Sequence, residues 1–224
     1  MTDERDPALP RLWTYWRSTA AYRVRIALNL KGIDYESVPV DLVRDGGQQR
    51  APDYLAVNPQ GLIPALAIDG QVLTQSTAII EYLEDAHPWP ALLPARPLEK
   101  ARVRAIAATI ACDVHPLNNL RVLQYLSGPL GVTSEARQTW YENWIAAGFQ
   151  ALEARLCDDP ATGKFCHGDQ PGLADILLVA QMYNAHRFKC DVSAYPTLNR
   201  IEASCLALPA FDAARPENQP EAPS

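Results

Sequence analysis

The chain has 224 residues, 48% of them hydrophobic, and its formal net charge at pH 7 is −6. A chain of this length and composition can form one large globular domain or two modest ones, each with its own core. The negative charge argues against nucleic acid or an anionic membrane surface as a partner, and no apolar run approaches the length of a membrane span.

The first residues and the cysteines indicate the compartment. Residues 1–11 are polar and charged, unlike a secretory signal, in which an apolar stretch follows a basic region. The five cysteines are an odd number, and no two of them form a CxxC pair. This favours reduced thiols over a disulfide framework or a zinc site. We therefore expect a cytoplasmic protein without a metal.

The first third of the chain combines strand and helix patterns in the order βαβ, then α, ββ, α. The first helical pattern ends at Lys31-Gly32, a cation followed by a glycine stop. Asp69-Gly70 is a strong two-residue hairpin signal between the last two strands. The predicted strands are 12–16, 35–41, 65–68 and 71–73, and the predicted helices are 24–30, 52–56 and 77–85. These patterns predict a small α/β domain over residues 1–88.

The rest of the chain has helical spacing of its apolar residues. Residues 87–97 contain four prolines and are typical of an inter-domain linker. Helices are predicted at 98–114, 117–126, 135–156, 173–187 and 198–206. We therefore expect an all-α domain over residues 98–215, followed by a Pro- and Glu-rich tail, 216–224, that is disordered.

The segment 17–25 places small hydroxyl residues between a strand end and a helix start. A helix N-terminus offers unpaired N–H groups and the positive end of a dipole, which favour a bound anion and lower the pKa of a thiol. Ser18 and Thr19 could equally be simple helix caps. The segment contains no cysteine, so a thiol that reacts here must come from a ligand.

Two further segments could present backbone and polar groups to a ligand. Pro64 directly precedes a strand pair, so it is a candidate cis-proline that would turn the backbone of Ile63 outward to pair with an extended ligand. The alternative is an ordinary turn proline. Gln75-Ser76 opens a helix, where it could bind a carboxylate or act only as a cap, with Ser76 as the capping residue.

These segments together resemble the zeta class of the glutathione transferases, the maleylacetoacetate isomerase family. The string at 18–28 reads S-T-A-A-Y-R-V-R-I-A-L, and it is followed by D-G-G-Q-Q at 45–49 and N-P-Q-G at 58–61. The similarity also includes Q-S-x-A-I-I-E-Y-L-E at 75–84, H-P-L-N-N at 115–119 and N-A-x-R-F at 184–188. It implies the glutathione transferase architecture, an α/β thioredoxin-like N-terminal domain followed by an all-α C-terminal domain that contributes the substrate site. It also implies a homodimer.

The resemblance implies a glutathione-dependent enzyme, a cis–trans isomerase that converts maleylacetoacetate to fumarylacetoacetate in tyrosine and phenylalanine breakdown. A glutathione thiolate would add to the double bond, which could then rotate before the thiolate is expelled. By the same resemblance, Ser18 would donate a hydrogen bond to the glutathione sulfur, Ile63 would pair with its cysteinyl unit, and Gln49 would reach its glycyl end. The implied cofactor-binding residues are Ser18, Thr19, Gln49, Ile63, Gln75, Ser76, His115, Asn119 and Arg121.

Three arginines stand out in this acidic chain as candidates for binding the small dicarboxylate. Arg17, Arg121 and Arg187 each carry a guanidinium group, which is well matched to bidentate carboxylate binding. Arg17 and Arg187 are the candidates for a catalytic role beside Ser18. Arg121 lies roughly one and a half helical turns from His115 and could face the same cleft. Each arginine could instead form a surface or inter-domain ion pair, and His115 could instead only cap a helix that starts there.

The chain departs from the family pattern at two positions. Many zeta members have a cysteine where this chain has Ala20, so that cysteine is not required for the activity of this chain. Members often begin the helix near residue 172 with a Thr-x-x-Asp capping box, whereas this chain has Gly172 three residues before Asp175. Glycine caps a helix at a cost of only a few tenths of a kcal/mol, so we expect the fold to be retained.

Other activities share these features. A maleylpyruvate isomerase of gentisate breakdown would perform the same step on a shorter diacid. The same thiolate could serve a general glutathione transferase or a haloacid dehalogenase, and some members of the superfamily are non-catalytic binding proteins. Ser18 together with the three arginines favours an enzyme.

Overall fold

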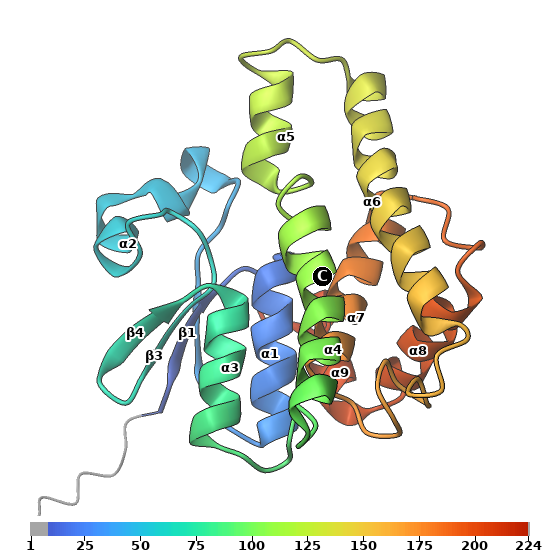
Figure 1. Cartoon of the computed structure of the whole chain (residues 1–224). Coiled ribbons are helices and arrows are strands. Elements are labelled where there is room, and N and C mark those ends of the chain that lie inside the picture. Colours follow the sequence, from blue (N-terminus) through green and yellow to red (C-terminus); the bar gives the residue numbers. More distant parts are fainter. Residues whose placement is uncertain (1–8, 224) are drawn as a thin grey trace, which may run out of the picture. The chain divides into compact units, whose positions relative to one another are not determined.

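The computed structural model describes residues 9–223 of the chain (Figure 1). The chain divides into two compact units. The first runs up to Pro90 and resumes at Pro209, and the second is Ala91–Leu208. The division at Pro90 falls inside the proline-rich segment 87–97. The return of the last residues to the first unit has no counterpart in the sequence prediction.

The first unit contains a four-stranded mixed sheet with the strand order β2-β1-β3-β4. Its strands are β1 (Arg11–Thr14), β2 (Glu36–Pro39), β3 (Ala65–Ile68) and β4 (Gln71–Thr74). β1 is parallel to β2 and antiparallel to β3, and β3 is antiparallel to β4. A parallel β-α-β unit followed by an antiparallel hairpin is the arrangement expected of a thioredoxin-like domain, so the predicted α/β fold is confirmed.

The hairpin between β3 and β4 follows directly from its two turn residues. Asp69 has φ of 50° and Gly70 has φ of 73°. Two consecutive positive φ values are those of a type I′ turn, whose twist matches that of the paired strands. Asp-Gly is among the residue pairs that this turn accepts best, which is why the sequence located the hairpin correctly.

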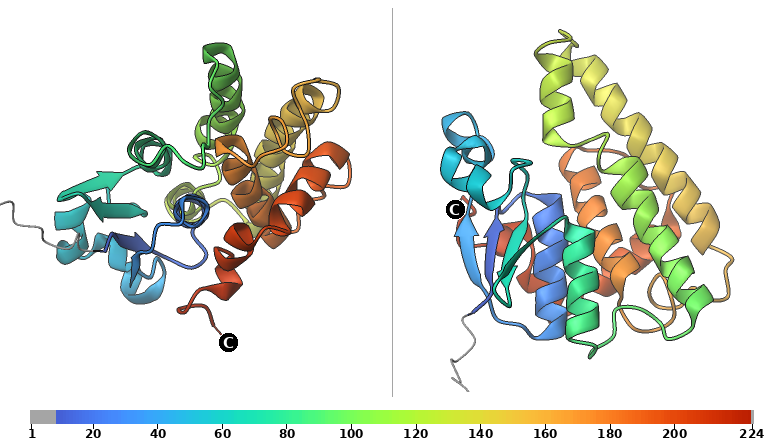
Figure 2. Two further views of the ribbon diagram at one scale, coloured as in Figure 1. Left: turned by 90° about the horizontal axis from the view of Figure 1, so that it is seen from below. Right: turned by 60° about the vertical axis from the view of Figure 1, so that its left-hand side comes forward.

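Four helices belong to the first unit: α1 (Thr19–Lys31), α2 (Pro52–Val57), α3 (Ser76–Ala86) and α9 (Pro209–Ala213). Figures 1 and 2 show α1 and α3 side by side against the same face of the sheet. α9 packs against α1 as well. α1 is therefore enclosed by the sheet and two helices, which explains why nearly all of its residues are buried.

The end of α1 is tied to the segment that leaves the first unit. Gly32 has φ of 65° and closes the helix, as the sequence predicts. The Nζ of Lys31 lies 2.6 Å from Glu84 Oε2 and donates to His87 O at 2.7 Å and to Pro90 O at 2.6 Å. Because the Lys31 side chain has no exposed surface, its charge is stabilised entirely by these oxygen atoms.

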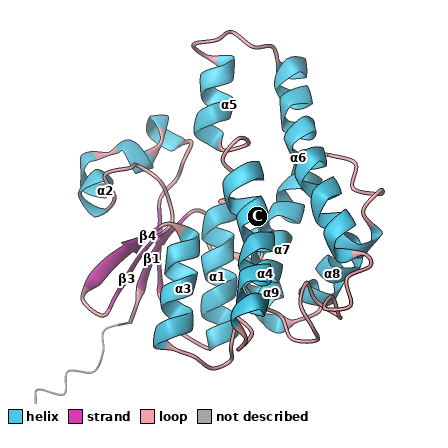
Figure 3. Ribbon diagram, in the orientation of Figure 1, coloured by secondary structure: helices cyan, strands magenta, loops and turns pink. Residues whose placement is uncertain are grey.

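The second unit consists of helices and loops, and no strand lies between Ala91 and Leu208, all of which the structure describes (Figure 3). The predicted all-α C-terminal fold is confirmed. α7 is buried along most of its length and packs against α4 and α8. The helices are α4 (Pro97–Ala108), the π-helical segment Thr109–Val114, α5 (Leu120–Ser127), α6 (Ser134–Leu156), α7 (Leu173–Arg187) and α8 (Pro196–Leu206). None of the helices described in residues 9–223 is both long and apolar enough to cross a membrane.

The starts of α5, α3 and α1 differ from the prediction in an informative way. The predicted helix 117–126 begins only at Leu120, because Asn119 is its N-cap and accepts a hydrogen bond from Arg121 N at 3.1 Å. His115 therefore precedes this helix and does not start it. Ser76 is the first residue of α3 and not its cap, because Gln75 occupies the cap position with φ of 68°. The first helix begins at Thr19, five residues before the predicted 24–30.

The last described residues differ from the predicted disordered tail. Pro216–Asn218 forms a short 3-10 turn. The Gln219 side chain is only 8% exposed and donates to Ala213 O at 3.0 Å and Arg215 O at 2.8 Å. Composition predicts disorder here because the segment is polar, but the buried Pro216 and a buried glutamine that satisfies two backbone carbonyls fix it.

Candidate functional site

The loop between β1 and α1 presents Ser18 as the N-cap of α1. Ser18 Oγ accepts a hydrogen bond from Ala21 N at 3.2 Å, and Ser18 N donates to Tyr15 O at 2.8 Å. Accepting from a backbone N–H does not use the hydroxyl proton. The half-buried Ser18 can therefore cap the helix and donate to an anion at the same time, so the two alternatives raised by the sequence are compatible. Thr19 is only 5% exposed and offers little of its surface to a ligand.

The fully buried Arg25 holds the loop between β1 and α1 in place through hydrogen bonds. Its Nη1 donates to Thr14 Oγ1 at 3.0 Å, and its Nη2 donates to Trp16 O at 3.0 Å. Its Nε donates to Ala214 O at 3.1 Å. The residues that lead into Ser18 are thus held by a charged side chain. Sequence reasoning missed this support, although an arginine at a position that helical spacing assigns to the core is a usable signal.

The cis-proline expected from the sequence is present, since the Ile63–Pro64 peptide bond is cis. The carbonyl of the preceding Leu62 accepts from Tyr54 OH at 2.6 Å and from Asn58 Nδ2 at 2.7 Å. Burial raises the pKa of Tyr54 to about 12, so its hydroxyl stays a donor at neutral pH. These two bonds hold the backbone at Ile63 just before β3 begins.

Gln75 and Ser76 lie at the N-terminus of α3. Gln75 is exposed and its Nε2 donates to Gln60 Oε1 at 2.9 Å. Ser76 is 6% exposed, and its Oγ accepts from Arg23 Nη1 at 3.4 Å. A helix N-terminus with a buried guanidinium beside its first hydroxyl is an environment that favours a carboxylate.

Gln49 is a buried amide with an unused acceptor. It is 7% exposed, and its Oε1 has no hydrogen-bond partner. Gly47 lies so close that a Cβ atom there would come within 2.6 Å of the Gln49 amide. The loop therefore encloses a carbonyl oxygen that costs stability until an N–H donor reaches it.

The second unit carries the other candidates. Arg187 is exposed at the end of α7, and its guanidinium carbon lies 5.0 Å from the centre of the Phe188 ring. Phe188 stacks on Tyr141 with ring centres 3.9 Å apart. Arg121 is exposed, and His115 is half-buried in the turn after the π-helical segment.

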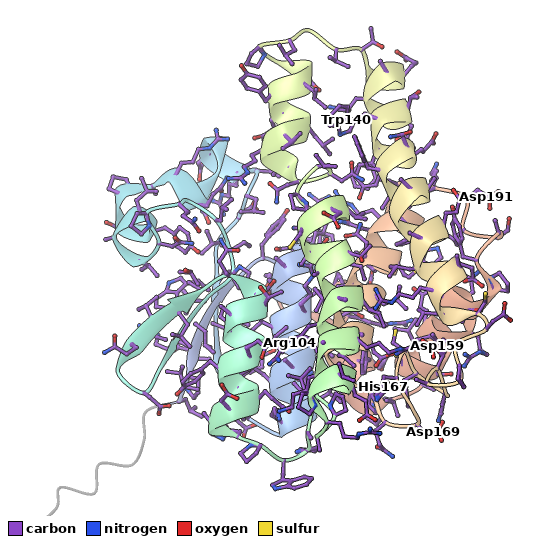
Figure 4. All side chains as sticks on the ribbon, viewed as in Figure 1. Arg104, Trp140, Asp159, His167, Asp169 and Asp191 are labelled. Carbon is purple, nitrogen blue, oxygen red and sulfur yellow. The ribbon has the colours of Figure 1, made fainter. Side chains whose placement is uncertain are left out.

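The turn that holds His115 is linked to α6. Trp140, labelled on α6 in Figure 4, donates its indole N–H to Leu117 O at 2.9 Å. Asn118 Nδ2 donates to Tyr141 O at 3.1 Å. The adjacent Asn119 uses its side-chain oxygen to cap α5, which leaves the amide Nδ2 as its donor. Trp140 and Tyr141 therefore connect the 115–119 turn to Phe188, the neighbour of Arg187.

Within residues 9–223, no group of three or more His, Cys, Asp or Glu side chains is arranged to hold a metal ion. The first unit contains seven of the candidate residues: Arg17, Ser18, Thr19, Gln49, Ile63, Gln75 and Ser76. His115, Asn119, Arg121 and Arg187 belong to the second.

Comparisons with known proteins point to one family. Residues 17–86 match the family model described as "Glutathione S-transferase, N-terminal domain". The chain is 53% identical over 212 residues to a protein of Vibrio cholerae named "Probable maleylacetoacetate isomerase", an alignment that covers 94% of this chain and 97% of that protein. Similarity of this extent includes both units.

Two solved structures have the same fold over nearly their whole length. One is the holo structure of a maleylpyruvate isomerase, a bacterial glutathione transferase of the zeta class, with a TM-score of 0.92, 46% identity and coverage of 95% of this chain and 100% of that one. The other is a maleylacetoacetate isomerase of Methylobacterium extorquens with bound malonate and glutathione, with a TM-score of 0.91, 46% identity and coverage of 96% and 100%.

Proposed function

Because the chain belongs to the zeta class of the glutathione S-transferase family, we propose that it is a glutathione-dependent cis–trans isomerase that converts maleylacetoacetate to fumarylacetoacetate. The observation that carries the proposal is the 53% identity, over almost the full length, to a relative that bears the name of this activity. The N-cap hydroxyl of Ser18 supports the proposal, because it can donate to an anion without leaving its helix.

The first unit fits glutathione. A tripeptide with two terminal carboxylates and a central thiol needs anion sites at both ends and a backbone partner between them. Gln75 and Ser76 at the start of α3 suit the γ-glutamyl carboxylate, and the backbone of Ile63 suits the cysteinyl unit. The orphaned Oε1 of Gln49 suits an N–H donor near the glycyl end. His115, Asn119 and Arg121 are proposed as further glutathione contacts. Thr19 is proposed to contact glutathione through its backbone at the start of α1, because its side chain is buried.

Glutathione, when bound, supplies a thiolate that adds reversibly to the activated double bond and is regenerated in each turnover. The protein favours this thiolate through the Ser18 hydroxyl and the N-terminal N–H groups of α1. Arg17 and Arg187 are proposed to bind the substrate carboxylates, each through a guanidinium group whose two N–H donors match the two oxygens. The catalytic set is therefore Ser18, Arg17 and Arg187.

The variant Ser18→Ala tests the assignment. With glutathione present, the purified protein should isomerise maleylacetoacetate, and Ser18→Ala should lower kcat/KM at least about tenfold because the thiolate loses a charge-assisted hydrogen bond. The matched control is Thr133→Ala, because Thr133 caps α6 with the same 3.2 Å bond to Ala136 N. Each variant should lose about 1 kcal/mol of cap stability, but only Ser18→Ala should lose activity. Equal activity in both variants would refute the role of Ser18.

Maleylpyruvate isomerisation is the second candidate function. It is favoured by the 46% identity and the TM-score of 0.92 to a maleylpyruvate isomerase. Pockets distinguish substrates that differ by one small apolar group by only about 1–3 kcal/mol, so the ratio of kcat/KM for the two diacids decides between them. A chain that binds glutathione but isomerises neither diacid would fit a general transferase or a haloacid dehalogenase. A chain that does not bind glutathione would fit a non-catalytic binding protein.

We also propose that the chain forms a homodimer in the cytoplasm. Resemblance to the superfamily supports the dimer, and light scattering of the purified protein measures it. Cell fractionation tests the location.

A further inference from the structure

The side chain of Arg17 is held without a counter-ion. Its Nη2 donates to Tyr15 OH at 3.0 Å. Its guanidinium carbon lies 4.9 Å from the centre of the Trp16 ring and 5.7 Å from that of the Tyr15 ring. In the part of the chain that the structure describes, no carboxylate lies within ion-pair distance of Arg17. A phenol and an indole therefore fix this cation without an ion pair.

The remaining donors of Arg17 are arranged to bind an anion. Its Nε is buried and has no hydrogen-bond partner. The charge of Arg17 contributes to the lowered pKa of Asp41, after the N–H groups of Arg44 and Val43, which donate to its Oδ1 at 3.0 and 2.8 Å, but the Asp41 carboxylate forms no ion pair with Arg17. A buried N–H group of a charged side chain costs stability until an acceptor reaches it. A ligand carboxylate is the acceptor that a guanidinium group binds best, through two parallel bonds.

The partner of Arg17 is itself rigid. Tyr15 is 7% exposed and packs in one apolar cluster with Val40, Tyr54 and Ile63. A phenol ring enclosed in this way has a fixed hydroxyl position. Because Arg17 is already bonded to this hydroxyl before a ligand binds, its side chain loses less conformational entropy on binding than a free arginine would.

We propose that Tyr15 is a positioning residue for the dicarboxylate: its hydroxyl, together with the Trp16 ring, holds the Arg17 guanidinium in the orientation that receives a substrate carboxylate. This inference rests on the proposed function and deepens it. Tyr15 sets the affinity for the diacid and does not act on glutathione. The selectivity of the enzyme for substrates with a carboxylate at that end depends on it.

The same apolar cluster provides an internal comparison. Tyr54 is 5% exposed, and its hydroxyl holds Leu62 O, beside the backbone proposed to bind glutathione. The two tyrosines thus share one core, but their hydroxyls support different ligands. Tyr195 in the second unit is 9% exposed and packs edge-on against Phe149, so it serves as a buried tyrosine outside both roles.

Three Tyr→Phe variants test the proposal by steady-state kinetics. Tyr15→Phe should raise the KM for the diacid about tenfold, the size expected for one hydrogen bond to a charged group, and leave the KM for glutathione within about twofold. Tyr54→Phe should do the reverse, and Tyr195→Phe should change neither constant. A KM for the diacid that is unchanged in a folded Tyr15→Phe variant would overturn the inference.

A double-mutant cycle shows whether Tyr15 acts through Arg17. In an Arg17→Met background, Tyr15→Phe should have no further effect on diacid binding. An equal loss in both backgrounds would mean that the hydroxyl does not act through Arg17, and would also overturn the inference. If Tyr15→Phe does not fold, Trp16→Leu takes its place, with the same expected rise in the KM for the diacid.

A binding measurement separates this inference from the proposed function. Malonate is titrated calorimetrically into the wild type and the Tyr15→Phe variant with glutathione present. If the wild type binds malonate about tenfold more tightly than the variant but isomerises neither diacid, the isomerase proposal fails and the positioning role of Tyr15 stands. If the wild type isomerises the diacid and both proteins bind malonate equally, only the positioning role fails.

Discussion

Asp175 shows how one buried carboxyl group can replace a missing cap. Its Oδ2 accepts from Gly172 N at 2.9 Å and its Oδ1 from Cys166 N at 2.8 Å. Gly172 has no side chain to complete a capping box, and a Cβ atom there would come within 2.6 Å of Leu92 O. Glycine is therefore the residue that allows Leu173 N to bond to Leu92 O at 2.9 Å.

The variant Asp175→Asn should destabilise the fold in a pH-dependent way. Burial raises the pKa of Asp175 to about 6, although the two backbone N–H groups favour the ionised form. Because this value lies above the ordinary one, the folded protein keeps a proton that the unfolded chain has released. The contribution of Asp175 to stability is therefore lost as the pH rises from about 4 to about 6.

Asparagine does not titrate, and it places an amide N–H₂ against a backbone donor, which costs about 1–3 kcal/mol. The difference in unfolding free energy between wild type and Asp175→Asn should thus be widest near pH 4 and narrower at pH 7. Urea unfolding at both values measures it. Asp191→Asn, at an exposed aspartate that accepts from Ser193 N at 2.9 Å, is the control. An equal gap at both pH values would contradict the assignment.

At the scale of elements, α6 and the π-helical segment Thr109–Val114 pack in direct contact through Gly148. A Cβ atom on Gly148 would lie 2.1 Å from Val114 Cγ2. Val114 is 1% exposed and has little room to move. Glycine inside a helix costs about 1 kcal/mol of stability relative to alanine. At position 148 the close packing of the two segments outweighs this cost.

Gly148→Ala should lower the unfolding free energy by about 1–3 kcal/mol through overpacking. Val114→Ala in the same chain should restore much of the loss, because it removes the clashing methyl group. The control is Ala147→Gly at the adjacent exposed position of α6, which should cost about 1 kcal/mol from propensity alone. Chemical denaturation measures all three, and a stabilised Gly148→Ala variant would show that the helices can separate freely.

Most elements could be predicted from the sequence because their signals are local. The Asp69-Gly70 turn, the glycine after Lys31 and the apolar spacing of α7 each depend on neighbouring residues. The start of α5 could not be predicted, because it depends on a single side-chain hydrogen bond by which Asn119 becomes the N-cap. The π-helical segment could not be predicted either, because Val114 is positioned by its contact with Gly148, which is distant in the sequence. In the candidate site, the motifs predicted the cis bond before Pro64 and the hydroxyl of Ser18 at the start of α1. The contacts of Tyr15 and Arg25 come from packing and leave no motif.

At the scale of the whole molecule, the last segment of the chain completes the first unit. Phe211 in α9 has no exposed surface, and the backbone around it accepts hydrogen bonds from two residues of α1: Asn29 donates to Ala210 O at 3.0 Å and Arg25 to Ala214 O at 3.1 Å. The thioredoxin-like unit is thus built from both ends of the chain.

Phe211→Ala should lower the unfolding free energy by about 3–5 kcal/mol, since it leaves a cavity beside α1. It should also weaken glutathione binding, because Arg25 supports the loop that carries Ser18. Calorimetric melting and glutathione titration measure the two effects. Leu130→Ala, at a leucine that is 58% exposed, should change neither, and a Phe211→Ala variant as stable as wild type would contradict the role of α9.

The position of α9 has a consequence for synthesis on the ribosome. Domains usually fold in the order in which they emerge, but here the unit that emerges first lacks α9 and its buried Phe211 until residues 209–213 are translated. The helical unit, Ala91–Leu208, is contiguous and can finish folding earlier. A nascent chain therefore completes the first unit only after α9 has been translated, and a chain released before that point lacks the contacts of α9 with α1.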